Sequence, residues 1–201
     1  MASGLFFLLL SCLLIATQGF VLPDKRAAFL AVTALASSTD AMPEVKVGDK
    51  IPNVAMMEGQ ADYGPPKEVM LGDLIAGKKV AIFAVPGAFT PGCSKSHLPS
   101  FIEAQDELKS KGVELTICIA TNDAFVMEAW GRTSGGADAG IVFLSDANGE
   151  LTKALGVVLD KPVMMRTKRF SLIAEDGVVT NYFSSDEEQS NTWAPSVLAA
   201  L

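Results

Sequence analysis

The sequence predicts an α/β fold in which helices flank a central mixed β-sheet. Between residues 80 and 155, short apolar and β-branched runs alternate with segments whose apolar residues recur at helical spacing. Two further apolar runs flank Glu175-Asp176-Gly177, which is typical of a β-hairpin. Strand–helix alternation gives parallel neighbours and a hairpin adds antiparallel ones, so the sheet is mixed.

The elements before the first central strand are the least regular. Residues 51–57 are expected to start a small hairpin, and residues 69–75 form a short amphipathic segment after a Gly-Pro-Pro turn at 64–66. Residues 80–85, Val-Ala-Ile-Phe-Ala-Val, are predicted to be a buried strand that ends abruptly at Pro86.

A helix is predicted for residues 93–111, because the pattern changes to helical spacing after Cys93, and Gly112 ends it. Pro99 lies inside this segment and should kink the helix or break it into two pieces, since proline lacks the N–H that the helix uses. The residues that recur at helical spacing are His97, Leu98, Phe101, Ile102 and Leu108.

The remaining elements continue this alternation. Strands are predicted at 113–120 and 141–144, helices at 123–132, 151–155 and 194–201, and the hairpin at 168–174 and 178–183. A chain of 201 residues with this pattern is one domain plus additional segments rather than two domains.

The additional segments lie at the N-terminus. Residues 5–15 are an apolar run too short to span a bilayer comfortably, and small residues follow, so residues 1–19 are predicted to be a signal peptide. Residues 20–41 start with Phe and are rich in Ala, Ser and Thr, which resembles the transit-peptide part of the bipartite presequence of algae with complex plastids. The domain then covers residues 42–201, and a secreted protein with a pro-segment is the alternative.

Charge and cysteine content exclude several classes of function. Residues 1–41 hold two charged residues of each sign, so the net charge of −7 remains without them. This acidic balance argues against nucleic acid and against an anionic membrane surface as partners. The chain has three cysteines, one histidine and no Cys-x-x-Cys pair, so we expect no metal and no other cofactor.

Cys93 is the candidate nucleophile. It lies in the first turn of a predicted helix, directly after a strand and a Pro- and Gly-rich turn. Unpaired N–H groups and the helix dipole create positive potential at that position, which favours a thiolate over a thiol.

The same residues resemble the peroxiredoxins, whose signature Pro-x-x-x-Thr-x-x-Cys is filled by Pro86, Thr90 and Cys93. The sequence PGAFTPGCSKSHLPSF is similar to the type II (peroxiredoxin-five) branch. Two further segments, 121–132 and 168–179, also resemble this branch, so the likeness runs from about residue 45 to the C-terminus. The resemblance implies a thioredoxin-like fold and a thiol peroxidase. It further implies that Arg169 completes the site by donating hydrogen bonds to the thiolate and to the peroxide.

Each candidate residue has a chemical role in that reaction. Cys93 supplies the sulfur, and the Thr90 hydroxyl can accept a hydrogen bond from peroxide or donate one to sulfur. Pro86 offers no N–H and shields the pocket from water. Arg132 is a weaker candidate for a supporting position beside the site. His97 shares a helical face with Cys93. The pair could suggest a cysteine hydrolase, although such enzymes normally bring the histidine from elsewhere in the fold, and the alternative is a histidine that packs and hydrogen-bonds locally.

Cys118 decides how the oxidised sulfur is resolved. Alternation along 113–120 places it with Glu114 and Thr116, on the more polar face of the strand, where it could be reachable. Its spacing from Cys93 is similar to that of plant-type members, in which the second cysteine resolves the sulfenic acid. A structural, inert Cys118 is the alternative.

The resulting hypothesis is reduction of hydrogen peroxide or alkyl hydroperoxides by Cys93, with Cys118 or an external thiol as the resolving group. The expected partners are glutaredoxin with glutathione, or thioredoxin, and a second copy in a homodimer. A monothiol glutaredoxin-like disulfide exchanger is one alternative, since residues 93–96 also match Cys-x-x-Ser. A non-enzymatic redox-sensing or chaperone module is another.

Overall fold

A computed structural model describes residues 42–159 and 164–201. The presequence predicted for residues 1–41 lies outside the described residues. No helix within the two described ranges is long and apolar enough to cross a membrane.

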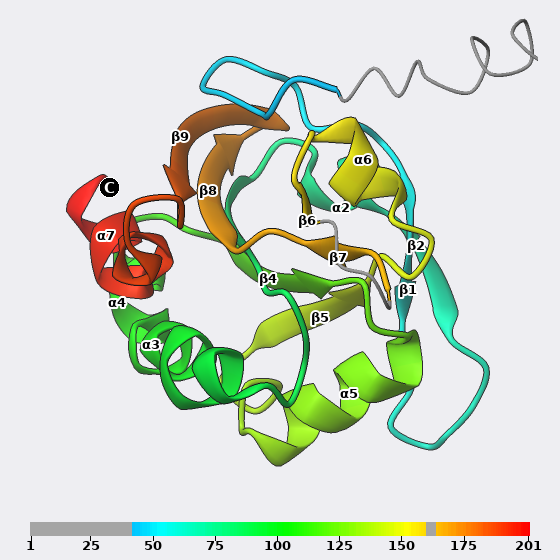
Figure 1. Cartoon of the computed structure of the whole chain (residues 1–201). Helices are drawn as coiled ribbons and strands as arrows, with labels where there is room; N and C mark the ends of the chain where they lie inside the picture. The colour runs from blue at the N-terminus through cyan, green and yellow to red at the C-terminus, as the bar shows by residue number, and fades with distance from the viewer. Residues whose placement is uncertain (1–41, 160–163) are drawn as a thin grey trace, which may run out of the picture. The chain divides into compact units, whose positions relative to one another are not determined.

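A seven-stranded mixed sheet forms the centre of the part of the chain that the structure describes, as predicted (Figure 1). Strands β3, β4 and β5 pair in parallel, β3 pairs antiparallel with β8, and β5 pairs antiparallel with β1. The strand order is β2 (Lys67–Met70), β1 (Ala55–Glu58), β5 (Ile141–Ser145), β4 (Leu115–Ala120), β3 (Lys79–Ala84), β8 (Phe170–Glu175) and β9 (Val178–Ser184).

Apolar side chains pack on both faces of this sheet, because successive side chains of a strand point in opposite directions. Phe83 and Cys118 lie on one face, and Ile82 and Ile117 lie on the other. The first face is covered by α3 (Leu98–Glu103), α4 (Gln105–Ser110), α5 (Ala124–Thr133) and α7 (Ala194–Ala199), and the second by α2 (Leu71–Ile75) and α6 (Glu150–Ala154). We call the first of these the helix-rich face.

The predicted helix 93–111 is broken, as Pro99 indicated, but into three pieces rather than two. A π-helical turn, η1 (Cys93–His97), precedes α3, and α4 follows after Ala104. The N–H of Leu98 donates to the carbonyl of Cys93, five residues back. This wider turn leaves room for the Pro99 ring, which would otherwise clash with the carbonyl four residues before it.

The hairpin predicted to start near residue 51 is present, as β1 paired with β2. The segment 69–75 was predicted as one amphipathic piece and is divided between β2 and α2. Strand β2 lies at the edge of the sheet, and two of its four side chains are exposed. Its sequence, Lys-Glu-Val-Met, is therefore too polar to be recognised as a strand from the hydrophobic pattern.

Three short elements complete the described residues. Strands β6 (Val158–Leu159) and β7 (Arg166–Thr167) pair with each other, and the 3-10 helix η2 (Gln189–Thr192) precedes α7. Arg166 of β7 contacts the Pro86 carbonyl before η1, and Thr192 of η2 contacts His97 at the end of η1.

Candidate active site

Cys93 lies where the predicted strand-to-helix transition places it. Strand β3 ends at Ala84, and helical backbone begins at Pro91, two residues before the cysteine. The thiol is fully buried on the helix-rich face of the sheet. Because the helix begins at Pro91, the N–H groups of Gly92 and Cys93 have no acceptor earlier in the helix.

Arg169 contacts the sulfur directly. Its Nη2 donates to Sγ of Cys93 over 3.1 Å, and only 9% of the residue is exposed. A Cβ atom on Gly92 would lie 3.4 Å from the same nitrogen, so the guanidinium also lies against the backbone at the start of the helix. The structure brings Cys93 and Arg169 together, although 75 residues separate them in the sequence.

The charge of Arg169 is unusual for a buried group. Among the described residues it forms no ion pair with a carboxylate. A buried cation is costly unless an anion or several hydrogen bonds compensate it. Its two hydrogen-bond partners are His97 and Cys93, so a thiolate on Cys93 is the anion that this geometry provides for.

His97 holds the other side of the guanidinium. Its Nδ1 lies 2.9 Å from Nη1 of Arg169, and its Nε2 lies 2.9 Å from the carbonyl oxygen of Thr192 and 3.4 Å from Oγ of Ser171. Arginine only donates, so Nδ1 accepts and the proton is on Nε2, which donates to the Thr192 carbonyl. Both ring nitrogens are thus engaged away from the sulfur, which favours a local structural role over the Cys–His pair of a hydrolase.

His97 is a neutral imidazole in the folded protein. Burial, and then the charge of Arg169, lower its pKa to about 3, against a small opposing contribution from the Thr192 carbonyl. It is the only histidine of the chain. Protonation would place a second cation against Arg169, so this network requires the neutral form.

This low pKa predicts that the protein loses stability as the pH falls below about 6.5. The unfolded chain then takes up a proton on His97 that the folded protein does not bind, so the loss continues towards the folded pKa of about 3. Between pH 7.5 and 5.5, His97 should lower the free energy of unfolding by about 1.4 kcal/mol.

Urea unfolding at these two pH values, on the parent chain and on His97→Asn, measures that contribution. Asparagine keeps an acceptor near the Nδ1 position but does not titrate, so its stability should depend less on pH. Equal pH dependence in the two proteins would contradict the buried neutral imidazole.

The hydroxyl oxygen of Thr90 is available as a hydrogen-bond acceptor. Its Oγ1 donates to the carbonyl oxygen of Gly87 over 2.8 Å, so the hydroxyl proton is used and the oxygen lone pairs remain. Of the two roles predicted for Thr90, accepting from peroxide fits this geometry better than donating to sulfur. Pro86 is half-buried.

Several residues that hold this arrangement have no distinguishing pattern in the sequence. Arg166 donates to the Pro86 carbonyl, and Asn122 accepts from the N–H of Ala88. Trp130 Nε1 donates to Oγ of Ser94 over 3.1 Å, which ties α5 to η1. Arg166 lies three residues before Arg169 and just outside the matched segment 168–179, and that proximity is the one signal that could have identified it.

Cys118 is not reachable, contrary to the sequence prediction. Alternation correctly separated Cys118 from Ile117 and Ile119, but its face is not the more polar one: Cys118 lies in the apolar cluster of the helix-rich face and is fully buried. The strand β4 is central, with β3 and β5 on either side, and helices cover the face that was expected to be open. Burial, and then the proximity of Cys93, raise the pKa of the Cys118 thiol well above its ordinary value.

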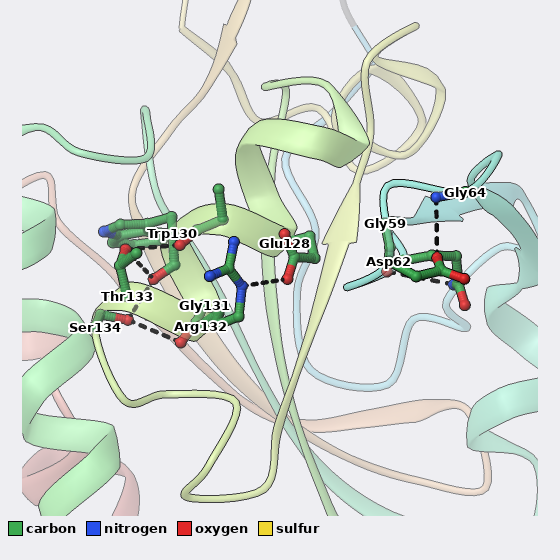
Figure 2. A network of polar contacts seen from close by, with 11 residues as sticks. Gly59, Asp62, Gly64, Glu128, Trp130, Gly131, Arg132, Thr133 and Ser134 are labelled. Carbon is green, nitrogen blue, oxygen red and sulfur yellow. Dashed lines mark hydrogen bonds and ion pairs between the residues drawn. The ribbon is translucent and has the colours of Figure 1, made fainter.

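Arg132 does not lie with the other candidates. Its Nε donates to Oε1 of Glu128 over 2.8 Å on the surface of α5, and nearly half of its side chain is exposed (Figure 2). Within the described residues no hydrogen bond or ion pair connects it to Cys93 or Arg169. The expected supporting position is therefore wrong, because Arg132 points along the outer side of α5 while Trp130 points inward.

No cluster of three His, Cys, Asp or Glu side chains suited to a metal ion occurs in residues 42–159 and 164–201. The donors that surround Cys93 are an arginine and helix N–H groups, which bind anionic oxygen or sulfur rather than a cation. The site can therefore hold a nucleophilic sulfur with hydrogen-bond donors and one acceptor beside it.

Comparison with known proteins relates this site to a family. Residues 46–201 match the Redoxin family model. Peroxiredoxin-2E-2, chloroplastic, from Oryza sativa subsp. japonica is 49% identical over 140 residues, which are 67% of this chain and 62% of the relative. Peroxiredoxin-2B from Arabidopsis thaliana is 42% identical, over 69% of this chain and 86% of the relative.

Solved structures show the same similarity. Reduced Prx3 from Vibrio vulnificus in complex with hydrogen peroxide is 38% identical with a TM-score of 0.71, covering 78% of this chain and 99% of that one. Peroxiredoxin 5 from Alvinella pompejana is 32% identical with a TM-score of 0.66, covering 78% and 97%. The match spans only 62% of peroxiredoxin-2E-2 and 65% of a second relative, Peroxiredoxin-2E, chloroplastic, from Arabidopsis thaliana.

Proposed function

We propose, since this chain belongs to the peroxiredoxins of the Redoxin family, that it is a thiol peroxidase with Cys93 as its peroxidatic residue. Hydrogen peroxide and alkyl hydroperoxides are the proposed substrates. The observation that carries this proposal is the 3.1 Å contact between Nη2 of the buried Arg169 and Sγ of Cys93. It supplies a positive charge where a reacting sulfur and a breaking O–O bond both need one.

The proposed reaction starts with attack of the Cys93 thiolate on one peroxide oxygen. An S–O bond forms, the O–O bond breaks, and the departing oxygen takes a proton to leave as water or alcohol. Sulfur loses two electrons to the peroxide and becomes a sulfenic acid. Arg169 stabilises the negative charge that moves from sulfur to the departing oxygen, and Thr90 Oγ1 accepts the peroxide O–H and so orients it. Pro86 keeps water from the reacting atoms, and His97 holds Arg169 in place.

An external thiol is the proposed resolving group. Cys118 is fully buried on a central strand and its thiol has a raised pKa, so it is a poor nucleophile where it lies. The sulfenic acid and an external thiol give a mixed disulfide and water, and a second thiol releases Cys93. Glutaredoxin with glutathione, or thioredoxin, would supply these thiols.

A homodimer of this chain is also part of the proposal, and sedimentation velocity would measure its oligomeric state.

Mass spectrometry after one equivalent of hydrogen peroxide tests the proposed function. The expected product carries one additional oxygen atom on Cys93, or a disulfide to an added thiol. An unmodified Cys93 after the peroxide has been consumed would overturn the assignment.

The buried position of Cys118 predicts slow alkylation in the native protein. Iodoacetamide should leave Cys118 unmodified until the protein is unfolded, because its thiol is fully buried and its pKa is raised. Peptide mapping of native and urea-treated samples measures both sites. The variant Cys118→Ala should still reduce peroxide through repeated cycles when an external thiol is supplied. Loss of this activity would restore Cys118 as the resolving cysteine.

We also propose delivery to a plastid, with residues 1–19 as signal peptide, residues 20–41 as transit peptide and a complex plastid as destination. Two relatives are chloroplastic by name, and the N-terminal sequence supports the bipartite form. Fusing residues 1–41 to a reporter protein in an alga with complex plastids tests this. Secretion of the reporter would contradict it.

A further inference from the structure

A second arginine, Arg166, holds the loop that carries Thr90. Its Nη1 donates to the carbonyl oxygen of Pro86 over 2.7 Å. A Cβ atom on Gly87 would overlap this nitrogen, so the guanidinium lies directly against the loop backbone, and a side chain at position 87 would displace it. Arg166 belongs to β7, three residues before Arg169, so one short segment contacts both sides of the site.

Gly87 connects this contact to the hydroxyl of Thr90. The Gly87 carbonyl oxygen accepts from Oγ1 of Thr90 over 2.8 Å and from its N–H over 3.5 Å. The next residue, Ala88, donates its N–H to Oδ1 of Asn122 over 2.9 Å. The position of the Thr90 oxygen therefore depends on a backbone segment that Arg166 and Asn122 hold from two sides.

The loop needs such restraint. Phe89 has a φ of +61°, in the left-handed region that residues with a Cβ atom rarely adopt. Its side chain is 57% exposed, so packing of the ring does not compensate for this conformation. Arg166 and Asn122 restrain the loop by hydrogen bonds from outside it, and a charged donor makes the stronger hydrogen bond.

We propose that Arg166 is a positioning residue that orients Thr90 for peroxide, while Arg169 acts at the sulfur. The inference rests on the proposed peroxidase function. Arginine suits the position because its flat guanidinium lies on the Gly87 backbone while one N–H reaches the Pro86 carbonyl, which the single ammonium of lysine would do less well.

The test compares Arg166→Met with Lys168→Met. Both variants remove one positive charge from the same segment, but Lys168 contacts Glu44 and Asp186 rather than the loop. The readout is the second-order rate constant for oxidation of Cys93 by hydrogen peroxide. We expect a decrease of about tenfold for Arg166→Met, because small displacements of orienting groups are costly. Lys168→Met should change the rate by less than about twofold.

Repeating Arg166→Met in a Thr90→Val background separates positioning from general damage. If Arg166 acts through Thr90, the second substitution has almost no further effect there, because effects that share one partner do not add. Arg166→Lys should recover part of the rate. If Arg166→Met does not fold, Arg166→Lys is measured in its place, both in the parent chain and in the Thr90→Val background.

An equal decrease in both backgrounds, or no decrease in either, overturns the role of Arg166. A parent chain that does not react with peroxide overturns the proposed function instead.

Discussion

Replacing Cys93 by serine is expected to lower the rate of peroxide reduction by about 10⁴-fold or more, because a serine hydroxyl is not ionised at neutral pH and its oxygen cannot take up the peroxide oxygen. Serine is close to cysteine in size and can accept the hydrogen bond from Nη2 of Arg169. The fold should therefore persist while the chemistry stops. Consumption of hydrogen peroxide with an excess of dithiol measures the rate.

Cys118→Ala is the matched control for this substitution. It removes the other buried sulfur of the same apolar cluster and should leave peroxide consumption within about twofold of the parent chain, since Cys118 lies outside the proposed chemistry. Peroxide consumption by Cys93→Ser at the parental rate would refute the assignment of the nucleophile.

Arg169→Met is expected to lower kcat/KM for hydrogen peroxide by about 10²–10³-fold, as for other donors that stabilise charge in a transition state. Methionine fills much of the same volume but removes the donor to Sγ and the buried positive charge. It also leaves Nδ1 of His97 without a donor, which should cost about 1–3 kcal/mol of folding stability. Stopped-flow oxidation and urea unfolding measure the two effects separately.

Arg169→Lys separates charge from geometry. Lysine keeps the positive charge, but its one ammonium cannot reach Sγ of Cys93 and Nδ1 of His97 as the two arms of the guanidinium do. An intermediate rate is expected. A rate constant for Arg169→Met equal to that of the parent chain would remove Arg169 from the proposed chemistry.

The sequence predicted the features that depend on local pattern. The parallel strands, the hairpin around Asp176 and the position of Cys93 at a helix start all follow from spacing over a few residues. Arg169 followed from the family resemblance, because no local rule connects a residue in front of β8 to a sulfur in η1. The length of the π-helical turn could not be predicted, since it depends on how the Pro99 ring fits against its own helix.

Tertiary packing explains the incorrect predictions. The face of Cys118 was predictable from alternation, but its burial depends on helices that arrive from other parts of the chain. Arg132 and Trp130 are neighbours in one helix, and only the packed structure shows that Trp130 turns inward and Arg132 outward. The Thr192 carbonyl and the Ser171 hydroxyl, which orient His97, are polar groups of a common kind with no identifying sequence pattern.

The contact between Trp130 and Ser94 has a practical consequence. Both tryptophans of the chain lie next to residues of the site, since Trp130 hydrogen-bonds the neighbour of Cys93 and Trp193 follows Thr192, whose carbonyl binds His97. Indole fluorescence responds to the polarity and hydrogen bonding of its surroundings. Any rearrangement of η1 when Cys93 is oxidised should therefore change the intrinsic emission, and the redox state of the protein could be followed optically without a label.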